Sequence, residues 1–147
     1  MKTPRLSLPF FVFLGAVAAF LFQTPAPAQA PEGEGEEEEE IGQFFDRLLI
    51  PDGMSKEDIQ AVLGEVLLGR EWTVKQKTDR RVVGHILHGG AEATVTMRFG
   101  GEAVEIYAFG WDLDRRGNRV EPYYPERWLR YLRKDLQGRF EQYGVGR

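Results

Sequence analysis

Few residues of this chain have the types and spacing that catalysis or metal binding requires. The 147 residues include two histidines, His85 and His88, and no cysteine. The histidines stand three residues apart in a segment with strand periodicity, so we expect them on opposite faces of a sheet, where they cannot hold one ion together. Ser55 stands just before a helical pattern, and a helix cap explains it. The sequence therefore predicts no catalytic nucleophile, no metal site and no cofactor.

Acidic side chains are the remaining candidates for chemistry. Asp112, Asp114 and Gly117 have part of the spacing of a calcium loop, but Arg116 stands where an oxygen ligand belongs, and we interpret the segment as a charged turn. Glycoside hydrolysis needs two carboxylates that face each other across a cleft. The pattern places the available acids at edges and turns of a small sheet: Glu92, Glu102, Glu105, Asp112 and Asp114.

Large aromatic residues alternate along residues 103–111. Every second position there is aliphatic and is expected to face the helices: Val104, Ile106 and Ala108. The other face then carries Tyr107, Phe109 and Trp111, an unusual set for a solvated surface. Two interpretations stay open, a docking face for a protein or a sugar ring, or burial under residues 41–50 or the final helix. The predicted interaction site also includes expected neighbours and a polar rim: Tyr123, Tyr124 and Arg127.

Hydrophobic periodicity predicts three helices and four strands. Helices are expected over residues 41–50, over 55–69, and from Pro125 to Leu136. Strands are expected over residues 72–77, 81–88, 92–99 and 103–111, and residues 112–124 are expected to form a polar loop. Short links favour pairing of adjacent strands. The predicted fold is an α+β two-layer sandwich, a four-stranded antiparallel meander with flanking helices in the order α-α-β-β-β-β-α.

The first 40 residues have the composition of an export signal followed by a spacer. Residues 1–30 contain a basic start, an apolar run and the small residues Ala28-Gln29-Ala30, which predict a secretory signal peptide cleaved after Ala30. Residues 31–40 are rich in Glu and Gly and are interpreted as a disordered spacer. Residues 41–147 are expected to form a single α+β domain. The mature protein is therefore predicted to be periplasmic or secreted, with no stable membrane span after cleavage.

The charge distribution bears on the choice of partner. Seven of the 23 acidic residues lie in residues 31–40, which leaves 16 acidic residues against 17 Lys and Arg from Ile41 onward. Because a near-neutral domain lacks the electrostatic footprint of a nucleic-acid binder, nucleic acid is not expected as a partner.

Three motifs carry a resemblance to a known family: Arg70-Glu71-Trp72-x-Val74, then Gly84-x-Ile86-x-His88 with Ala93 to Phe99, and Arg127-Trp128-Leu129 with Asp135-Leu136. On these motifs, residues 55–136 resemble a family of small exported bacterial proteins, often lipoproteins, whose activity is unassigned. The order of helix and strands is also loosely similar to PepSY-type inhibitory domains. The motifs are mostly core positions, so the resemblance implies a fold rather than a site.

The sequence thus predicts an exported, non-catalytic binding or accessory module of the bacterial envelope. Its partner would be an envelope protein or a glycan, and a homodimer is compatible with the pattern. An inhibitor of an exported hydrolase is one alternative, and a carboxylate-based enzyme acting on glycans is another.

Overall fold

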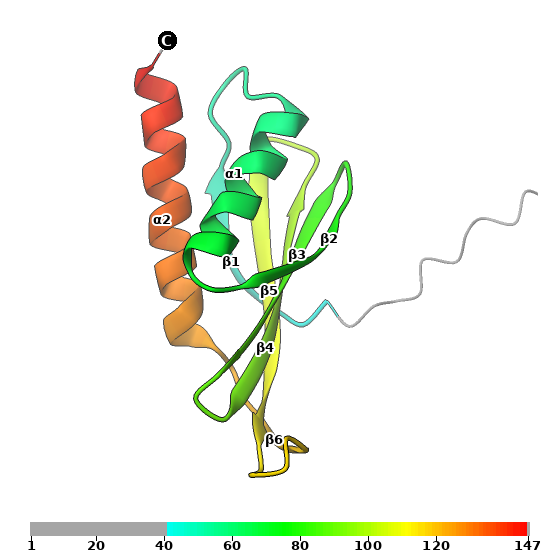
Figure 1. Cartoon of the computed structure of the whole chain (residues 1–147). Coiled ribbons are helices and arrows are strands. Elements are labelled where there is room, and N and C mark those ends of the chain that lie inside the picture. Colours follow the sequence, from blue (N-terminus) through cyan, green and yellow to red (C-terminus); the bar gives the residue numbers. More distant parts are fainter. Residues whose placement is uncertain (1–40, 147) are drawn as a thin grey trace, which may run out of the picture. The chain divides into compact units, whose positions relative to one another are not determined.

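Six antiparallel strands and two helices make up residues 41–146, the part of the chain that this computed structural model describes (Figure 1). In chain order the elements are β1 (Gln43–Leu49), α1 (Lys56–Gly69), β2 (Thr73–Lys77), β3 (Arg81–His88), β4 (Ala91–Phe99), β5 (Ala103–Leu113), β6 (Arg119–Pro122) and α2 (Glu126–Val145). The predicted α+β class with an antiparallel sheet is confirmed. The predicted signal peptide and spacer lie outside the described residues.

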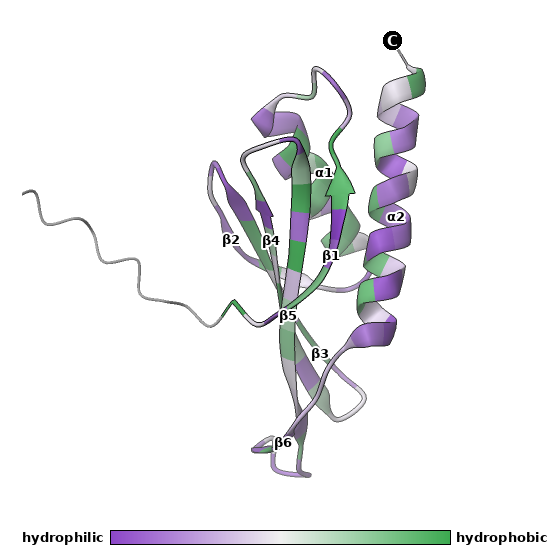
Figure 2. Cartoon of the chain, turned by 180° about the vertical axis from the view of Figure 1, so that it is seen from behind, coloured by the Kyte–Doolittle hydropathy of each residue, from purple (hydrophilic) through white to green (hydrophobic). Residues whose placement is uncertain are grey.

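The sheet is larger than predicted. Its strand order is β1-β5-β4-β3-β2, and β6 pairs with the far end of β5. The strands β2 to β5 are hydrogen-bonded in sequence order, and β1 and β6 extend the sheet on the β5 side. Both helices lie on one side of the sheet. When the molecule is seen from behind, the strands therefore stand in front of α1 (Figure 2). We call the helix-free side the open face.

The helix predicted over residues 41–50 is wrong, because this segment is strand β1. It pairs antiparallel with β5, and the register passes from Phe44 opposite Tyr107 to Asp46 opposite Ile106, so Phe45 is the extra residue of a β-bulge. A bulge breaks the alternation of inward and outward side chains. The apolar residues therefore recur at a spacing that imitates a helix.

The polar loop predicted over residues 112–124 is also wrong in part. Asp112 and Leu113 continue β5, and Arg119–Pro122 form the short, fully exposed strand β6. Its proline is tolerated because β6 lies at the edge of the sheet, where a missing ladder donor costs little. Pro125 is the N-cap of α2 and so precedes the first helical residue.

The core lies between the sheet and the two helices. In α1 the Ser55 hydroxyl accepts the Asp58 N–H and the Asp58 carboxylate accepts the Ser55 N–H, so the predicted capping pair is confirmed. Side chains from both helices and from the inward positions of the sheet are fully buried together, among them Leu63, Leu67, Val95, Met97, Ile106, Leu129, Leu132 and Leu136. Neither helix of residues 41–146 has the length and apolar character needed to cross a bilayer.

Candidate functional site

An aromatic strip runs along β5 on the open face. The inward residues Val104, Ile106 and Ala108 have no exposed surface, which confirms the predicted alternation. Tyr107, Phe109 and Trp111, which we call the aromatic strip, point the other way and are half-buried. Neither helix covers them, since both pack on the opposite side of the sheet (Figure 2).

Strand β1 adds an aromatic residue that the sequence analysis placed on a helix. Phe44 lies opposite Tyr107 in the register, and the two rings meet edge to face with centroids 5.6 Å apart. Phe44 remains 52% exposed. The Tyr107 hydroxyl donates to Glu105 at 3.0 Å. Burial, and next the hydrogen bond to Glu105, raise the pKa of Tyr107, so its hydroxyl stays protonated at neutral pH.

A charged cluster closes the β6 end of the aromatic strip. The Arg119 guanidinium lies over the Trp111 ring, 5.6 Å from its centroid, and also pairs with the carboxylate of Glu92. The same carboxylate lies 3.5 Å from His85 Nε2. His85 therefore points to the open face. The cation–π contact between Arg119 and Trp111 favours a fixed orientation of the Trp111 ring.

The Trp111 indole nitrogen is an unusual feature of this surface. It is buried and has no hydrogen-bond partner among the described residues. Buried tryptophan N–H groups normally find an acceptor, and an unsatisfied one costs about 1–3 kcal/mol.

The other members of the predicted site lie away from the aromatic strip. The Tyr123 N–H donates to the Gly110 carbonyl at 2.9 Å, and its ring lies 5.7 Å from that of Trp128 on α2. Tyr124 packs against the core beside the helices, and burial raises the pKa of its hydroxyl. Arg127 is exposed on the first turn of α2. The structure therefore places Tyr123 and Tyr124 on the helix side. The pairing of the strands does not bring either residue to the open face.

A second aromatic cluster, which the sequence analysis did not single out, lies on the helix side. Trp128 is its centre, with Trp72 at 6.2 Å and His88 at 6.4 Å between ring centroids, both nearly perpendicular to it. His88 thus lies on the face opposite His85, as the alternation predicts. Trp72, His88 and Trp128 each belong to a different one of the three motifs quoted in the sequence analysis, so those motifs contained a signal for this cluster.

An ion pair fixes the same region. Arg70 donates to both carboxylate oxygens of Asp135, at 2.6 and 3.0 Å, and its guanidinium lies 5.1 Å from the centre of the Tyr131 ring. The hydrogen bond from Arg70 lowers the pKa of Asp135, and the same bond raises the pKa of Arg70. Trp128, His88 and Tyr131 line a cavity of about 300 Å³ beside this pair. Because the pair joins the end of α1 to α2, it supports a structural role.

The acids proposed for chemistry have separate roles. Asp114 accepts N–H groups from Arg116 and Asn118 and the Asn118 side-chain amide, and these bonds, led by the Asn118 side chain, lower its pKa. The segment that resembles a calcium loop is therefore a turn closed by Asp114. Glu92 and Glu105 are held by Arg119 and Tyr107. Within residues 41–146, no group of three or more His, Asp and Glu side chains could hold a metal ion.

Arginines gather at the other end of the open face. Across the sheet, Arg47 of β1 stands opposite Glu105, Glu105 opposite Arg98, and Arg98 opposite Arg81 of β3. We call Arg47, Arg98 and Arg81 the arginine row. Arg47 and Arg98 also line a cavity of about 320 Å³ together with Arg80 and two glutamates, Glu102 and Glu105.

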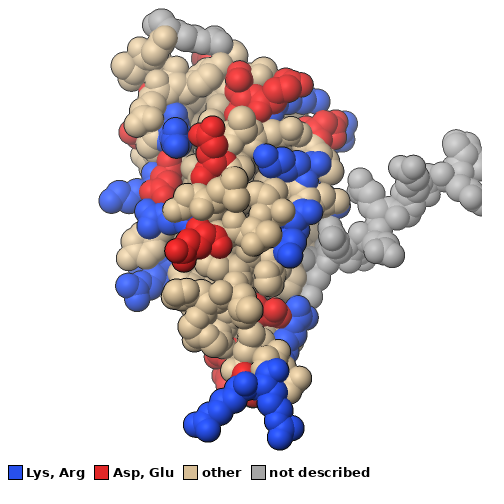
Figure 3. Space-filling view, viewed as in Figure 1, with Lys and Arg blue, Asp and Glu red and all other residues tan. Residues whose placement is uncertain are grey.

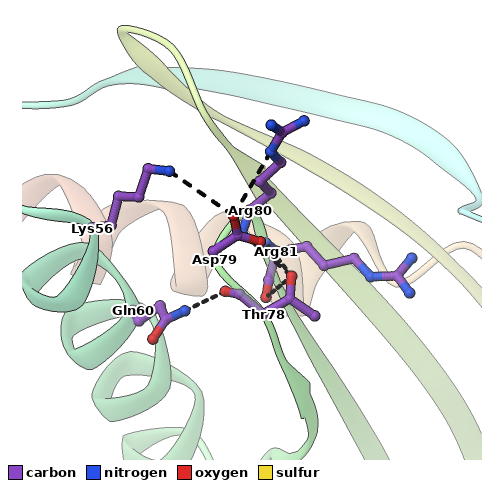
Figure 4. A network of polar contacts seen from close by, with 6 residues as sticks. All are labelled: Lys56, Gln60, Thr78, Asp79, Arg80 and Arg81. Atoms are coloured by element: carbon purple, nitrogen blue, oxygen red, sulfur yellow. Dashed lines mark hydrogen bonds and ion pairs between the residues drawn. The ribbon is translucent and has the colours of Figure 1, made fainter.

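The turn between β2 and β3 sets the positions of Arg80 and Arg81. The Thr78 hydroxyl accepts the N–H groups of both, at 3.3 and 3.1 Å, and the Gln60 side chain of α1 donates to the Thr78 carbonyl (Figure 4). The Asp79 carboxylate lies 3.9 Å from Nζ of Lys56 on one side and 3.9 Å from Nε of Arg80 on the other. The guanidinium groups of Arg80 and Arg81 point away from α1 (Figure 4).

Comparison with known proteins gives no relative: the chain matches no family model, no curated protein and no solved structure. The resemblance to small exported proteins therefore stays a prediction, and function has to be argued from the open face and its chemistry.

Proposed function

We propose that this protein is an exported, non-catalytic binding or accessory module of the bacterial envelope, and that the open face of its sheet is the docking surface. The observation that carries the proposal is the aromatic strip with Phe44 beside it, on a side of the sheet that neither helix covers. Half-exposed aromatic side chains supply large contact area and anchor many interfaces. The order of basic, apolar and small residues over positions 1–30 supports export.

The polar surroundings of the aromatic strip also favour binding over catalysis. The two acidic side chains beside the strip already have partners, since Glu92 pairs with Arg119 and Glu105 accepts the hydroxyl of Tyr107. The surface offers the aromatic planes of the strip and of Phe44, which suit recognition of a protein main chain or a sugar ring.

Quantitative capture tests the proposal. The full-length gene is expressed in its own host with a C-terminal tag, the protein is crosslinked in the envelope fraction, and the Trp111→Ala and Phe44→Ala forms are compared with the unaltered protein. Interface anchors of this kind are worth about 2 kcal/mol, or roughly thirty-fold in Kd. Both substitutions should therefore lower the yield of the same partner strongly, in protein whose circular dichroism is unchanged.

Tyr131→Ala is the matched control, since Tyr131 is an aromatic residue of α2 that is 41% exposed on the helix side. It should leave capture unchanged. Equal capture by all four forms would refute the open face as the docking surface. If the partner is an exported hydrolase, inhibition of its purified activity identifies an inhibitor.

A further inference from the structure

We infer that the free edge of β1 is a peptide-binding site, at which an extended segment of another protein adds to the sheet as a further strand beside α2. β1 stands at one end of the strand order β1-β5-β4-β3-β2, so one of its edges is turned away from the described sheet. This edge is distinct from the aromatic strip. The inference therefore goes beyond the proposed function and does not depend on it.

The backbone of β1 offers hydrogen-bonding groups at this edge. Successive residues of an antiparallel strand direct their N–H and C=O groups alternately toward the partner strand and away from it. The Ile50 N–H donates to the Glu102 carbonyl at 2.8 Å, so the preceding residue, Leu49, directs both of its groups to the free edge. Arg47 follows the same alternation, and its N–H donates to the Asp46 carboxylate at 2.8 Å. An added strand can therefore bond to both groups of Leu49 and to the Arg47 carbonyl.

The other end of the sheet is protected against such pairing. Strand β2 has five residues, of which Lys75 and Lys77 are exposed, and its pairing with β3 shifts register in the middle. Short length, lysines and bulges are common means of keeping an edge strand from pairing. In β1 the register shift lies before Asp46, and the regular part that follows includes Leu49, which is 73% exposed. The β1 edge is thus the more receptive of the two.

A groove beside β1 gives the side chains of an added strand a place to lie. The groove has a volume of about 390 Å³ and is lined by residues of both β1 and α2, which stand side by side (Figure 2). Its apolar walls include Leu48, Pro51 and Phe140. Because side chains alternate along a strand, every second one would enter this groove, and the others would lie beside Leu49 on the open face.

Helix α2 determines which kind of partner fits the edge. A row of hydrogen-bonded side chains runs along α2 beside the groove, from Arg133 to Gln137 at 3.1 Å and from Gln137 to Glu141 at 2.9 Å. Arg133 is also bonded to Asp46 of β1. A second sheet that approached this edge would bring its own helix layer against α2. A single extended peptide carries no such layer, so the groove suits a peptide rather than another sheet.

Charge and register specify the chemistry of the peptide. Acidic and basic side chains are interspersed over the helix side (Figure 3), so recognition there depends on individual positions rather than on an overall charge. Arg47 is exposed and lines the groove. An antiparallel strand would place three successive residues opposite Leu49, Leu48 and Arg47. We therefore expect two apolar residues followed by Asp or Glu, because a carboxylate in the third place pairs with the guanidinium.

A synthetic peptide tests the inference. The probe is acetyl-Ser-Val-Leu-Val-Glu-Ser-amide, in which the leucine is placed to pair with Leu49 and the glutamate with Arg47. It is titrated into isotope-labelled protein that has been purified as the cell processes it. The amide NMR signals of Leu49 and Arg47 should shift, and those of Trp111 and Lys75, far from the groove, should stay in place.

Methylation of single peptide nitrogens distinguishes strand pairing from apolar contact alone. A methyl group on the leucine nitrogen removes the donor to the Leu49 carbonyl and should weaken binding by about ten-fold or more. The valine that follows the leucine directs its N–H away from β1, so methylation there is the matched control and should change binding by less than about three-fold.

Exchange of charges tests the register. Arg47→Glu should weaken binding of the probe about five-fold, and a probe with lysine in place of glutamate should regain that loss. Arg115→Glu is the matched control, because Arg115 is exposed in the turn between β5 and β6. It should leave the binding of both probes unchanged.

Three results would overturn the inference. The first is an unshifted Leu49 amide signal at about 2 mM probe, a concentration that detects even weak binding. The second is an equal loss of affinity from the two methylated probes. The third is sedimentation that shows a dimer of the protein which the probe dissociates, because a second copy of the chain would then occupy the edge. Partner capture by the open face enters none of these results, so the inference can fail while the proposed function stands.

Discussion

Arg70 and Asp135 show how one residue pair ties together distant parts of the sequence. They are 65 residues apart, and their two hydrogen bonds connect the end of α1 to the middle of α2. The guanidinium also lies against the Tyr131 ring, which restricts its orientation. Partly exposed ion pairs usually contribute about 0–1 kcal/mol, and the two-point geometry places this pair toward the upper end.

We predict that Asp135→Asn lowers the free energy of unfolding by about 0.5–1 kcal/mol at pH 7. The pKa of Asp135 is lower in the folded protein than its ordinary value of 3.8. The stabilisation is therefore complete above about pH 4–5 and is lost as the pH falls through the folded pKa. Urea unfolding at pH 7 and pH 3 should show a difference between variant and unaltered protein that shrinks in acid.

Glu121→Gln is the control for this prediction, because Glu121 is exposed on β6. Its effect on unfolding should be within about 0.5 kcal/mol at both pH values. A cost of Asp135→Asn that stays the same at pH 7 and pH 3 would contradict the ion-pair origin of the stabilisation.

At the scale of elements, β1 is the main departure from the sequence-based fold. Helical spacing places Leu48 and Leu49 together on one apolar stripe. In the strand they point to opposite faces, so that Leu48 is 8% exposed and Leu49 is 73% exposed. The two neighbouring leucines therefore distinguish the strand from the helix.

We predict that Leu48→Ala lowers the free energy of unfolding by about 2–5 kcal/mol, because it leaves a cavity in the core. Leu49→Ala should change it by less than about 0.5 kcal/mol, since its side chain is in solvent. Urea unfolding followed by tryptophan fluorescence measures both. Similar costs for the two substitutions would indicate that residues 43–49 do not form this strand.

Local periodicity was enough for the elements whose partners lie nearby. Strands β2 to β5 and helix α1 have short connections, and the sequence predicts them within a few residues, although the pairing of β2 also shifts register between Val74 and Gln76. Helix α2 begins where predicted but ends at Val145, nine residues beyond the predicted end at Leu136. The β1 pattern is interrupted by the bulge at Phe45, and its partner β5 lies far along the chain. Strand β6 has only four residues, all exposed, so it carries no periodic signal.

The candidate site was predictable only where it follows one strand. Alternation along β5 located Tyr107, Phe109 and Trp111 on one face. Tyr123 follows β6, and the direction in which the chain turns there depends on its bond to the Gly110 carbonyl. A contact of this kind is tertiary, and no local pattern in the sequence encodes it.

At the scale of the whole chain, processing of the N-terminus is the first thing to establish. We predict that the protein recovered from the envelope begins at Pro31, as its intact mass will show. Ala30→Phe should block processing, because a bulky side chain replaces the small residue next to the cleavage site, whereas Gln29→Phe at the tolerant position between the alanines should not. Recovery of chains that begin at Met1 would contradict the prediction.

The pairing of β1 with β5 also determines how late in synthesis the sheet can be completed. Asp46 and Ile106 are register partners, so about 60 residues must follow the first strand before its neighbour exists. At about 5–20 residues per second, a ribosome needs roughly 3–12 seconds to supply them. During this interval β1 has no β5 to pair with, so the sheet of the described residues remains incomplete until β5 has been synthesised.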